Sequence, residues 1–252
     1  MDAAPQTSPA TVVFVHGFLG FGRVPVLKVP YFRGVDALMA GVGAPFLAPG
    51  LPRAASVRER AEALARVLAG SAAPAFVLVG HSMGGLDSRF VAARLDPGRR
   101  VKAVVTLGTP HRGSPLADWA LAGKDPLAWL ASRCWRSALS DLTPAAAIRF
   151  NADFPDRPDV RYLSFAGARP AAEIPAWARR FHRLIEGAEG DNDAQVSVQS
   201  ARWGDFRGAV RADHWELIGW NLTLADRAQA RPFGHLELLA AAVRDGLAAA
   251  EV

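Results

Sequence analysis

The sequence is poor in cysteine and in lysine. Cys134 is its single cysteine, so no disulfide can form within the chain and the fold must be held by packing. Three lysines stand beside 26 arginines, and these cations are dispersed, with no block of about five or more like charges that would indicate a nucleic-acid-binding tail. The net charge of +5 over 252 residues itself says little about a partner and is most simply a solubility feature, and without such a tail we expect no nucleic-acid partner.

The sequence also has no long apolar run. No stretch approaches the roughly 18 apolar residues that would span a bilayer, so we expect no transmembrane segment. Residues 1–10 have neither the basic nor the apolar region of a signal peptide, and the sequence leaves the cellular location open. Half of the residues are nevertheless hydrophobic and 21% are charged, which is enough apolar material for a large core.

Four short apolar runs are rich in β-branched residues, at positions 11–15, 75–79, 101–107 and 160–165. Continuous runs of this kind are typical of parallel strands that helices cover on both faces. Helices are predicted between and after them, at 56–68, 82–95 and 235–250; Ser56 and Glu59 have the spacing of a capping box, and Gly70 is placed for a left-handed cap. The alternation predicts an α/β fold with a mostly parallel central sheet, in one domain over residues 1–252.

The most informative motif is Gly80-His81-Ser82-Met83-Gly84, which fits G-x-S-x-G between a strand and a helix. In this context the motif is a nucleophile elbow, a sharp turn that exposes the serine hydroxyl at the end of the sheet. The flanking glycines are needed because a Cβ there would collide with neighbouring backbone. The alternative is a glycine-rich turn whose serine merely caps a helix. A serine at this position argues against enzymes that attack with a carboxylate.

A serine nucleophile that attacks an acyl group needs two donors for the tetrahedral oxyanion. The N–H of Met83, directly after the nucleophile, is one candidate. The second is the N–H of Phe18, in the loop after the first strand, where Gly17 lets the backbone turn toward the site. His16 precedes that loop, and we interpret it as an anchor of the loop rather than as a base.

With these residues in place, the sequence resembles the bacterial triacylglycerol lipases of the Pseudomonas and Burkholderia type, within the α/β-hydrolase superfamily. The similar segments are VHGFLGFG (15–22), YFRGV (31–35), GHSMGG (80–85), TLGTPHRGSPLAD (106–118), LTPAAAIRFNADFP (142–155) and NDAQVS (192–197). The resemblance implies the α/β-hydrolase fold with a helical lid insertion, placed at residues 115–155. It also implies hydrolysis of hydrophobic carboxylic esters such as acylglycerols at a lipid–water interface, through a Ser–His–Asp acyl-enzyme mechanism.

The same resemblance orders the catalytic residues along the chain as serine, aspartate and histidine. Of the six histidines, His16, His81 and His111 lie before the acid or in structural turns, and His182 also precedes it. His214 lies in a segment similar to the family's D/N-H-x-D and is the predicted base, with His235 as the alternative.

The predicted acid is Asp193, within NDAQVS and 21 residues before His214. Its role would be to fix the tautomer of the histidine and to stabilise the imidazolium. Asp191 is the alternative, whereas Asp205 and Asp213 are interpreted as surface or turn carboxylates.

A predicted lid helix begins at Asp125-Pro126, an N-cap followed by a first-turn proline. One of its faces gathers apolar residues, namely Leu127, Leu130, Ala131, Cys134, Trp135 and Ala138, while Trp129 lies opposite among polar residues. Two interpretations stay open: a face that covers the site and meets lipid when it opens, or an ordinary helix packed on the core.

Many members of the resembled family hold a structural calcium near the histidine loop. Here the acidic position is Glu216, but Trp220 stands where an amide would be needed, so the ligand set for a hard cation is incomplete. We therefore expect no metal and no cofactor.

The same fold and machinery also serve thioesterases, polyester depolymerases and acyltransferases. These remain alternatives to a lipase or carboxylesterase. A non-catalytic binding protein is disfavoured, because it would not need the serine, aspartate, histidine and oxyanion segments together.

Overall fold

A six-stranded sheet forms the centre of the computed structural model, which describes residues 10–20, 30–222 and 233–251. The strand order is β2-β1-β3-β4-β5-β6, and every neighbouring pair is parallel. The strands are β1 (Thr11–Val15), β2 (Phe46–Leu47), β3 (Phe76–His81), β4 (Val101–Leu107), β5 (Arg161–Gly167) and β6 (Asp205–Val210). The predicted fold class is confirmed, and the four apolar runs are β1, β3, β4 and β5.

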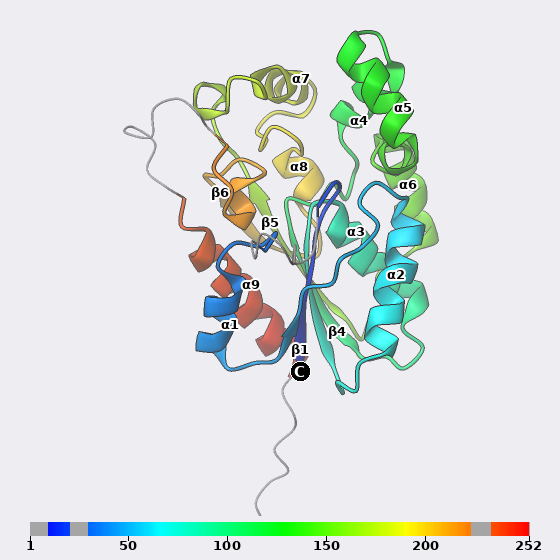
Figure 1. Cartoon of the computed structure of the whole chain (residues 1–252), viewed down its shortest axis with the longest axis vertical. Coiled ribbons are helices and arrows are strands. Elements are labelled where there is room, and N and C mark those ends of the chain that lie inside the picture. The colour runs from blue at the N-terminus through cyan, green and yellow to red at the C-terminus, as the bar shows by residue number, and fades with distance from the viewer. Residues whose placement is uncertain (1–9, 21–29, 223–232, 252) are drawn as a thin grey trace, which may run out of the picture.

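The central strands are buried on both faces because helices cover each side of the sheet. Residues that alternate along β1 and β3 fall into two separate cores: Val12 and Val77 belong to one, Val13 and Leu78 to the other. The first core packs against α1 (Val35–Val42) and α9 (His235–Ala250), and the second against α2 (Val57–Ala69) and α3 (Met83–Phe90). Figure 1 shows α1 and α9 to the left of the sheet and α2 and α3 to its right.

The two strands that the pattern did not predict lie at the edges of the sheet. β2 has two residues, too few for any periodic signal. In β6, exposed and half-buried residues alternate instead of forming an apolar run. Edge strands have only one neighbouring strand, and these two are less buried than β1, β3 and β4.

Helix termini follow the sequence signals with two differences. The capping box at α2 is present, with Ser56 and Glu59 each accepting from the other's backbone N–H. Gly70 ends the helix with an ordinary right-handed φ of −75° instead of the expected left-handed cap. The helix predicted over residues 82–95 is α3 followed by a π-helical turn, η1 (Val91–Leu95).

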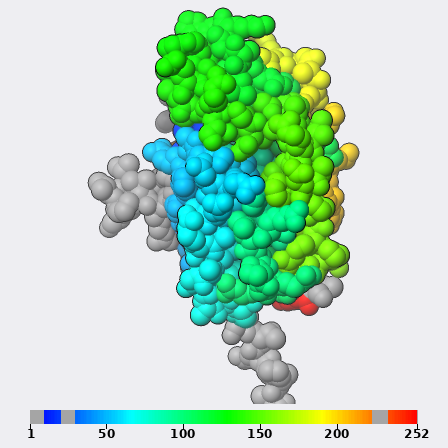
Figure 2. Space-filling model, turned by 90° about the vertical axis from the view of Figure 1, so that its right-hand side faces the viewer, coloured from blue at the N-terminus to red at the C-terminus, as the bar shows by residue number. Residues whose placement is uncertain are grey.

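A helical cap lies beyond the carboxyl end of the sheet (Figure 1). It consists of α4 (Pro115–Ala122), α5 (Pro126–Asp141) and α7 (Arg179–Glu189), whereas α6 (Pro144–Asp153) lies lower, beside α2, and packs on the second core through Phe150. Arg180 of α7 pairs with Asp125, the N-cap of α5, at 3.0 Å. Figure 2 shows the green segment that contains α5 above the cyan surface of α2.

Candidate functional site

Ser82 occupies a strained turn between β3 and α3. Its φ is 54° and its ψ is −130°, a conformation that non-glycine residues rarely adopt. The turn is held by Ser82 N–H donating to Leu107 O (2.9 Å) and by Thr109 Oγ1 donating to Ser82 O (2.8 Å). Such stored strain is typical of functional residues, because it persists only where the surrounding structure enforces it.

The glycines around Ser82 are required by space. A Cβ on Gly80 would lie 2.6 Å from Gly84 O, and one on Gly84 would lie 2.2 Å from Val15 O. A Cβ on Gly85 would lie 2.1 Å from Thr109 Oγ1. The start of α3 therefore packs directly on the ends of β1 and β3, which is the close approach expected of an elbow. Because Met83 is the first residue of α3, its N–H belongs to the orphan donors of a helix N-terminus.

The loop after β1 lies against this elbow. A Cβ on Gly17 would be 2.8 Å from Ser82 Cβ, so only a glycine lets the loop come so near. His16 anchors the loop: its Nδ1–H donates to Gly17 O, and its Nε2 accepts from Leu51 N–H, both at 2.9 Å. Burial, with a smaller contribution from Arg60, lowers the pKa of His16 to about 4. The loop that carries Phe18 is thus held by a neutral histidine.

The predicted acid and base lie together. Asp193 Oδ2 is 2.7 Å from His214 Nδ1, and both side chains are buried. Because a carboxylate only accepts, Nδ1 carries the hydrogen, which leaves Nε2 as the basic nitrogen. The other oxygen of Asp193 accepts from the N–H groups of Gln195 and Val196, so the carboxylate is fixed on both sides.

The backbone also joins these two segments. His214 N–H donates to Asp193 O (2.9 Å), and a Cβ on Gly108, at the end of β4, would lie 3.0 Å from Asp193 Oδ2. The acid–base pair therefore lies next to the carboxyl end of β4, the strand whose Leu107 O accepts from Ser82 N–H. The catalytic roles of Ser82, Asp193, His214, Phe18 and Met83 stay predictions.

His81 has a position that sequence reasoning missed. Its Nε2–H donates to His214 O (2.9 Å), and its Nδ1 accepts from the hydroxyl of Tyr31 (2.8 Å). Tyr31 in turn accepts from Gly17 N–H (3.2 Å). Burial, assisted by the nearby His214, holds the pKa of His81 well below its ordinary value, so the chain of hydrogen bonds keeps one direction. No sequence signal other than its place within the elbow could have indicated this link.

The remaining candidates lie elsewhere. Asp191 is exposed, and His235 Nε2 lies 3.1 Å from Arg33 O, at the start of α9. His111 is a buried structural residue whose ring contacts Thr106 and Arg89. Asp213 is a turn carboxylate, one of the two roles expected for it: it is buried, and its Oδ1 caps the turn by accepting from two backbone N–H groups.

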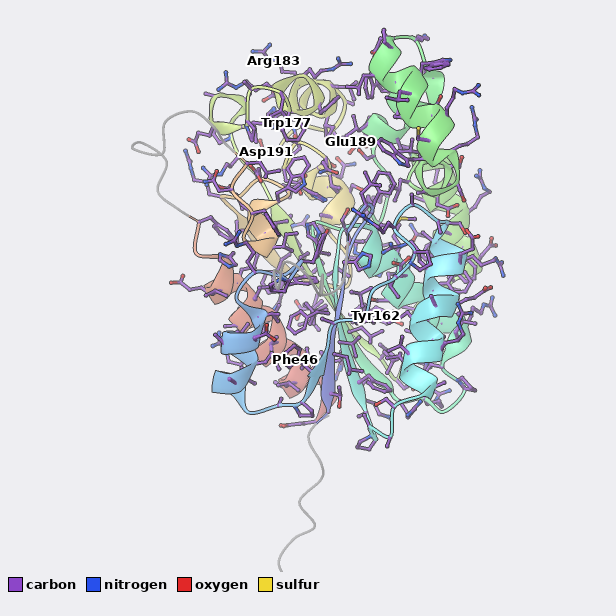
Figure 3. All side chains as sticks on the ribbon, in the orientation of Figure 1. Phe46, Tyr162, Trp177, Arg183, Glu189 and Asp191 are labelled. Carbon is purple, nitrogen blue, oxygen red and sulfur yellow. The ribbon has the colours of Figure 1, made fainter. Side chains whose placement is uncertain are left out.

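The cap approaches the site through aromatic contacts. Trp135 lies at a kink inside α5, with φ −135° and ψ 24°, and its ring packs edge-on against Phe18 at 5.7 Å. On the other side, Trp177 packs against Trp215, the residue after His214, at 5.0 Å. Trp177 lies at the α7 end of the molecule in Figure 3.

The apolar face expected on α5 is only partly covered. Its Leu127 and Leu130 are 46% and 49% exposed, and Trp129, expected among polar residues, is 54% exposed. The buried residues of the helix are mostly small, namely Ala128, Ala131, Ser132, Ala138 and Leu139. Small residues allow the helix to lie close to its neighbours while the large apolar side chains project outward. The first turns of α5 thus present an apolar surface to solvent.

Comparisons with known proteins agree with this architecture. The family model described as "PGAP1-like alpha/beta domain" matches residues 68–170. Triacylglycerol lipase 2 of Saccharomyces cerevisiae is 28% identical over 218 residues, which span 80% of this chain and 66% of that protein. A triacylglycerol lipase of Burkholderia plantarii is 38% identical over 126 residues, which span 46% of this chain and 34% of that protein.

A solved structure extends the likeness over nearly the whole chain. The metagenomic carboxyl esterase MGS0156 superimposes with a TM-score of 0.73 at 24% identity, covering 96% of this chain and 76% of that one. The chain is thus similar in sequence to triacylglycerol lipases and in fold to a carboxyl esterase. It has the α/β-hydrolase fold, and it matches less than two thirds of the length of the curated lipases named above.

The lipase relationship raises the question of calcium, and the residues at the expected position do not fit it. Both carboxylate oxygens of Glu216 accept from Arg169, at 2.6 and 3.1 Å. The indole N–H of Trp220 donates to Tyr31 O (2.8 Å) and supplies no oxygen. Within residues 10–20, 30–222 and 233–251, no group of three or more His, Cys, Asp or Glu side chains could hold a metal ion.

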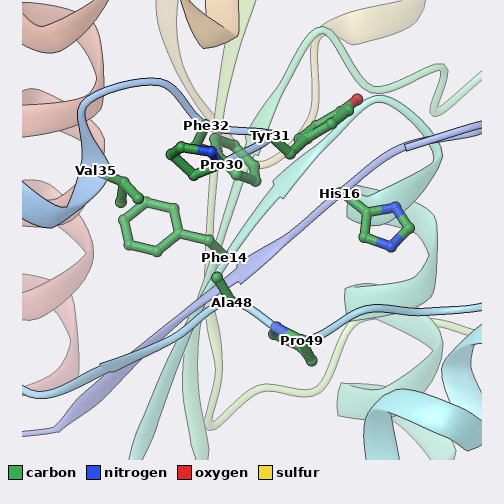
Figure 4. A pocket seen from close by; sticks show the side chains of 8 residues that line it. All are labelled: Phe14, His16, Pro30, Tyr31, Phe32, Val35, Ala48 and Pro49. Atoms are coloured by element: carbon green, nitrogen blue, oxygen red, sulfur yellow. The ribbon is translucent and has the colours of Figure 1, made fainter. Parts of the chain in front are cut away.

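A small apolar hollow lies behind the loop after β1 (Figure 4); its lining consists of Phe14, His16, Pro30, Tyr31, Phe32, Val35, Ala48 and Pro49. It lies beside the anchor of the loop and has none of Ser82, Asp193 and His214 in its wall. In the described part of the chain, no helix is both long and apolar enough to cross a membrane.

Proposed function

We propose that this protein is a serine hydrolase of hydrophobic carboxylic esters, in the class of lipases and carboxylesterases. The observation that carries the proposal is the 2.7 Å contact between Asp193 and His214, set against an elbow that holds Ser82 at a positive φ. A binding protein would need neither the strained serine nor the fixed tautomer. The curated relatives that are named triacylglycerol lipases support the same class.

In the proposed mechanism, Ser82 Oγ attacks the ester carbonyl while its proton passes to Nε2 of His214. The carbonyl π electrons move onto oxygen, and the N–H groups of Phe18 and Met83 stabilise the resulting oxyanion. His214 then protonates the alkoxide oxygen as the C–O bond breaks, which releases the alcohol and leaves an acyl-enzyme. Water attacks this ester with the same groups and regenerates Ser82 with a free carboxylic acid.

The segment 115–155 is proposed as a lid that meets a lipid–water interface. Leu127, Trp129 and Leu130 are exposed on the first turns of α5, with Trp129 on another face than the two leucines, and the same helix reaches Phe18 through Trp135. Movement of α5 would therefore displace the loop that carries Phe18, the predicted oxyanion donor. Exposed apolar patches of this kind mark sites that contact an apolar partner.

The experiment that tests the function is a series of soluble esters of increasing acyl length, followed by emulsified triglyceride. We expect hydrolysis by the wild type and none above background by Ser82→Ala. Asp193→Asn should lower kcat by about 10⁴-fold, because the amide favours the wrong histidine tautomer. An unchanged rate in either variant would contradict the proposal, and thioester or polyester turnover without ester turnover would redirect it to another substrate class.

A further inference from the structure

Arg169 lies at the centre of a partly buried charge cluster next to the turn of the predicted base. It follows β5, and its side chain is 5% exposed. Its guanidinium donates from Nε to Glu216 Oε2 (2.6 Å) and from Nη2 to Glu216 Oε1 (3.1 Å), a bidentate pair. The third nitrogen, Nη1, donates to Glu173 Oε2 at 2.8 Å. One cation thus joins two carboxylates from segments far apart in the sequence.

The Glu216 partner belongs to the turn that carries His214. Glu216 Oε2 also accepts from Asp213 N–H (2.9 Å), and Asp213 Oδ1 accepts from the N–H groups of Trp215 and Glu216. The carboxylate held by Arg169 therefore closes the turn across its apex, residue His214. A planar guanidinium restrains both position and orientation of a carboxylate, which a single hydrogen bond does not.

The backbone of Arg169 belongs to the segment that carries the acid. Its N–H donates to Asn192 O (3.1 Å), directly before Asp193 in the chain, and its C=O accepts from Nε2 of the buried His182 (2.8 Å). The same residue therefore contacts the acid loop through its backbone and the base loop through its side chain. A displacement of Arg169 would change the relative position of Asp193 and His214.

We propose that Arg169 is a positioning residue for the reaction, and that its guanidinium is the cation that holds the His214 turn to the Asp193 loop. This inference rests on the proposed function. It accounts for the poor fit of Glu216 to calcium: both of its oxygens are already used by a cation that the chain itself supplies. The role is indirect, because Arg169 acts on the acid–base pair through Glu216 and Asn192.

An ordinary buried ion pair would stabilise the fold without affecting the chemistry, so the test must separate the two effects. The variants are Arg169→Met, which removes the donors, Arg169→Lys, which keeps the charge but not the bidentate geometry, and Glu216→Gln. The matched control is Arg157→Met. Arg157 also joins two carboxylates, Asp96 and Asp159, and it donates to Ala92 O, but these partners do not belong to the Asp193 or His214 loops.

The measurements are kcat, KM and Tm with a soluble short-chain ester. Because small misplacements of catalytic groups reduce rate strongly, we expect Arg169→Met to lower kcat by about 10- to 100-fold, with KM changed less than about 2-fold. Glu216→Gln should lower kcat in the same direction, and Arg169→Lys should be intermediate. Arg157→Met should lower Tm while retaining the wild-type kcat. If Arg169→Met does not fold, the Lys and Gln variants carry the same comparison.

Two results would overturn the inference. The first is a wild type that hydrolyses esters while the Arg169 and Glu216 variants retain its kcat and lose only Tm, as the control does. The second is a wild-type kcat that falls on treatment with a calcium chelator and returns with calcium, because the guanidinium would then not be the cation that holds the turn. A wild type with no ester hydrolysis would instead refute the proposed function, and this inference with it.

Discussion

Protonation of His16 is expected to destabilise the protein in mild acid. In the folded state Nε2 accepts from Leu51 N–H and Nδ1–H donates to Gly17 O, so a second ring proton would face another donor. Burial and the charge of Arg60 accordingly lower the pKa of His16 from 6.5 to about 4. The unfolded chain binds this proton more readily, and the stability that neutral His16 provides is lost as the pH falls from about 6.5 to about 4.

The size of the effect follows from the two pKa values. Relative to high pH, their separation lowers the unfolding free energy by about 3 kcal/mol below about pH 4 and by about 2.5 kcal/mol at pH about 4.5. The assay is urea unfolding near neutral pH and near pH 4.5, for the wild type and for His16→Gln. The glutamine amide oxygen can still accept from Leu51 N–H but does not titrate.

The comparison isolates His16, because other groups that titrate, including the buried His81 and His111, are present in both proteins. We expect the wild type to lose about 2 kcal/mol more than His16→Gln over this pH range. Equal losses of unfolding free energy in the two proteins would refute the assignment of His16 as a neutral histidine with two hydrogen bonds that anchors the loop of Phe18.

Three further perturbations test the elbow, the hydrogen-bond chain and the cap. Gly84→Ala should lower the unfolding free energy by more than about 3 kcal/mol in urea melts, because its Cβ would lie 2.2 Å from Val15 O; a near-neutral effect would contradict the packing. Tyr31→Phe should cost about 2–4 kcal/mol and lower kcat, since Gly17 N–H loses its acceptor; unchanged urea melts and ester kinetics would show the chain to be dispensable. Trp129→Ser should weaken adsorption to emulsified triglyceride by about 10-fold while leaving soluble-ester kinetics unchanged, and equal effects on both substrates would argue against interfacial contact.

The sheet and the elbow could be predicted because their signals are local. Continuous apolar runs indicate strands buried on both faces, and the elbow motif combines glycines that only close packing explains. The edge strand β6 was missed because it is half-exposed, so its sequence alternates instead of forming an apolar run. What covers the apolar face of α5 stayed open for a related reason: amphipathic spacing identifies an apolar stripe but not what covers it, and here Leu127 and Leu130 project into solvent.

The contacts behind the site could not be predicted, because they join residues far apart in the chain. Asp193 and His214 were predicted from family segments, but the hydrogen bond from His81 to His214 O spans 133 positions and leaves no pattern in the sequence. Likewise, the sequence indicated only that Glu216 belongs to an incomplete ligand set for calcium, and only the fold brings Arg169 to its carboxylate. Charge pairs of this kind depend on loop geometry that composition and periodicity do not encode.

The most direct test of the proposed chemistry is the reaction of the protein with a fluorophosphonate, followed by intact-mass and peptide analysis. The proposal predicts one adduct per chain, located on Ser82, absent from Ser82→Ala and formed far more slowly by Asp193→Asn. Labelling of another residue, or labelling of Asp193→Asn at the wild-type rate, would contradict the assignment of Ser82, His214 and Asp193 as nucleophile, base and acid.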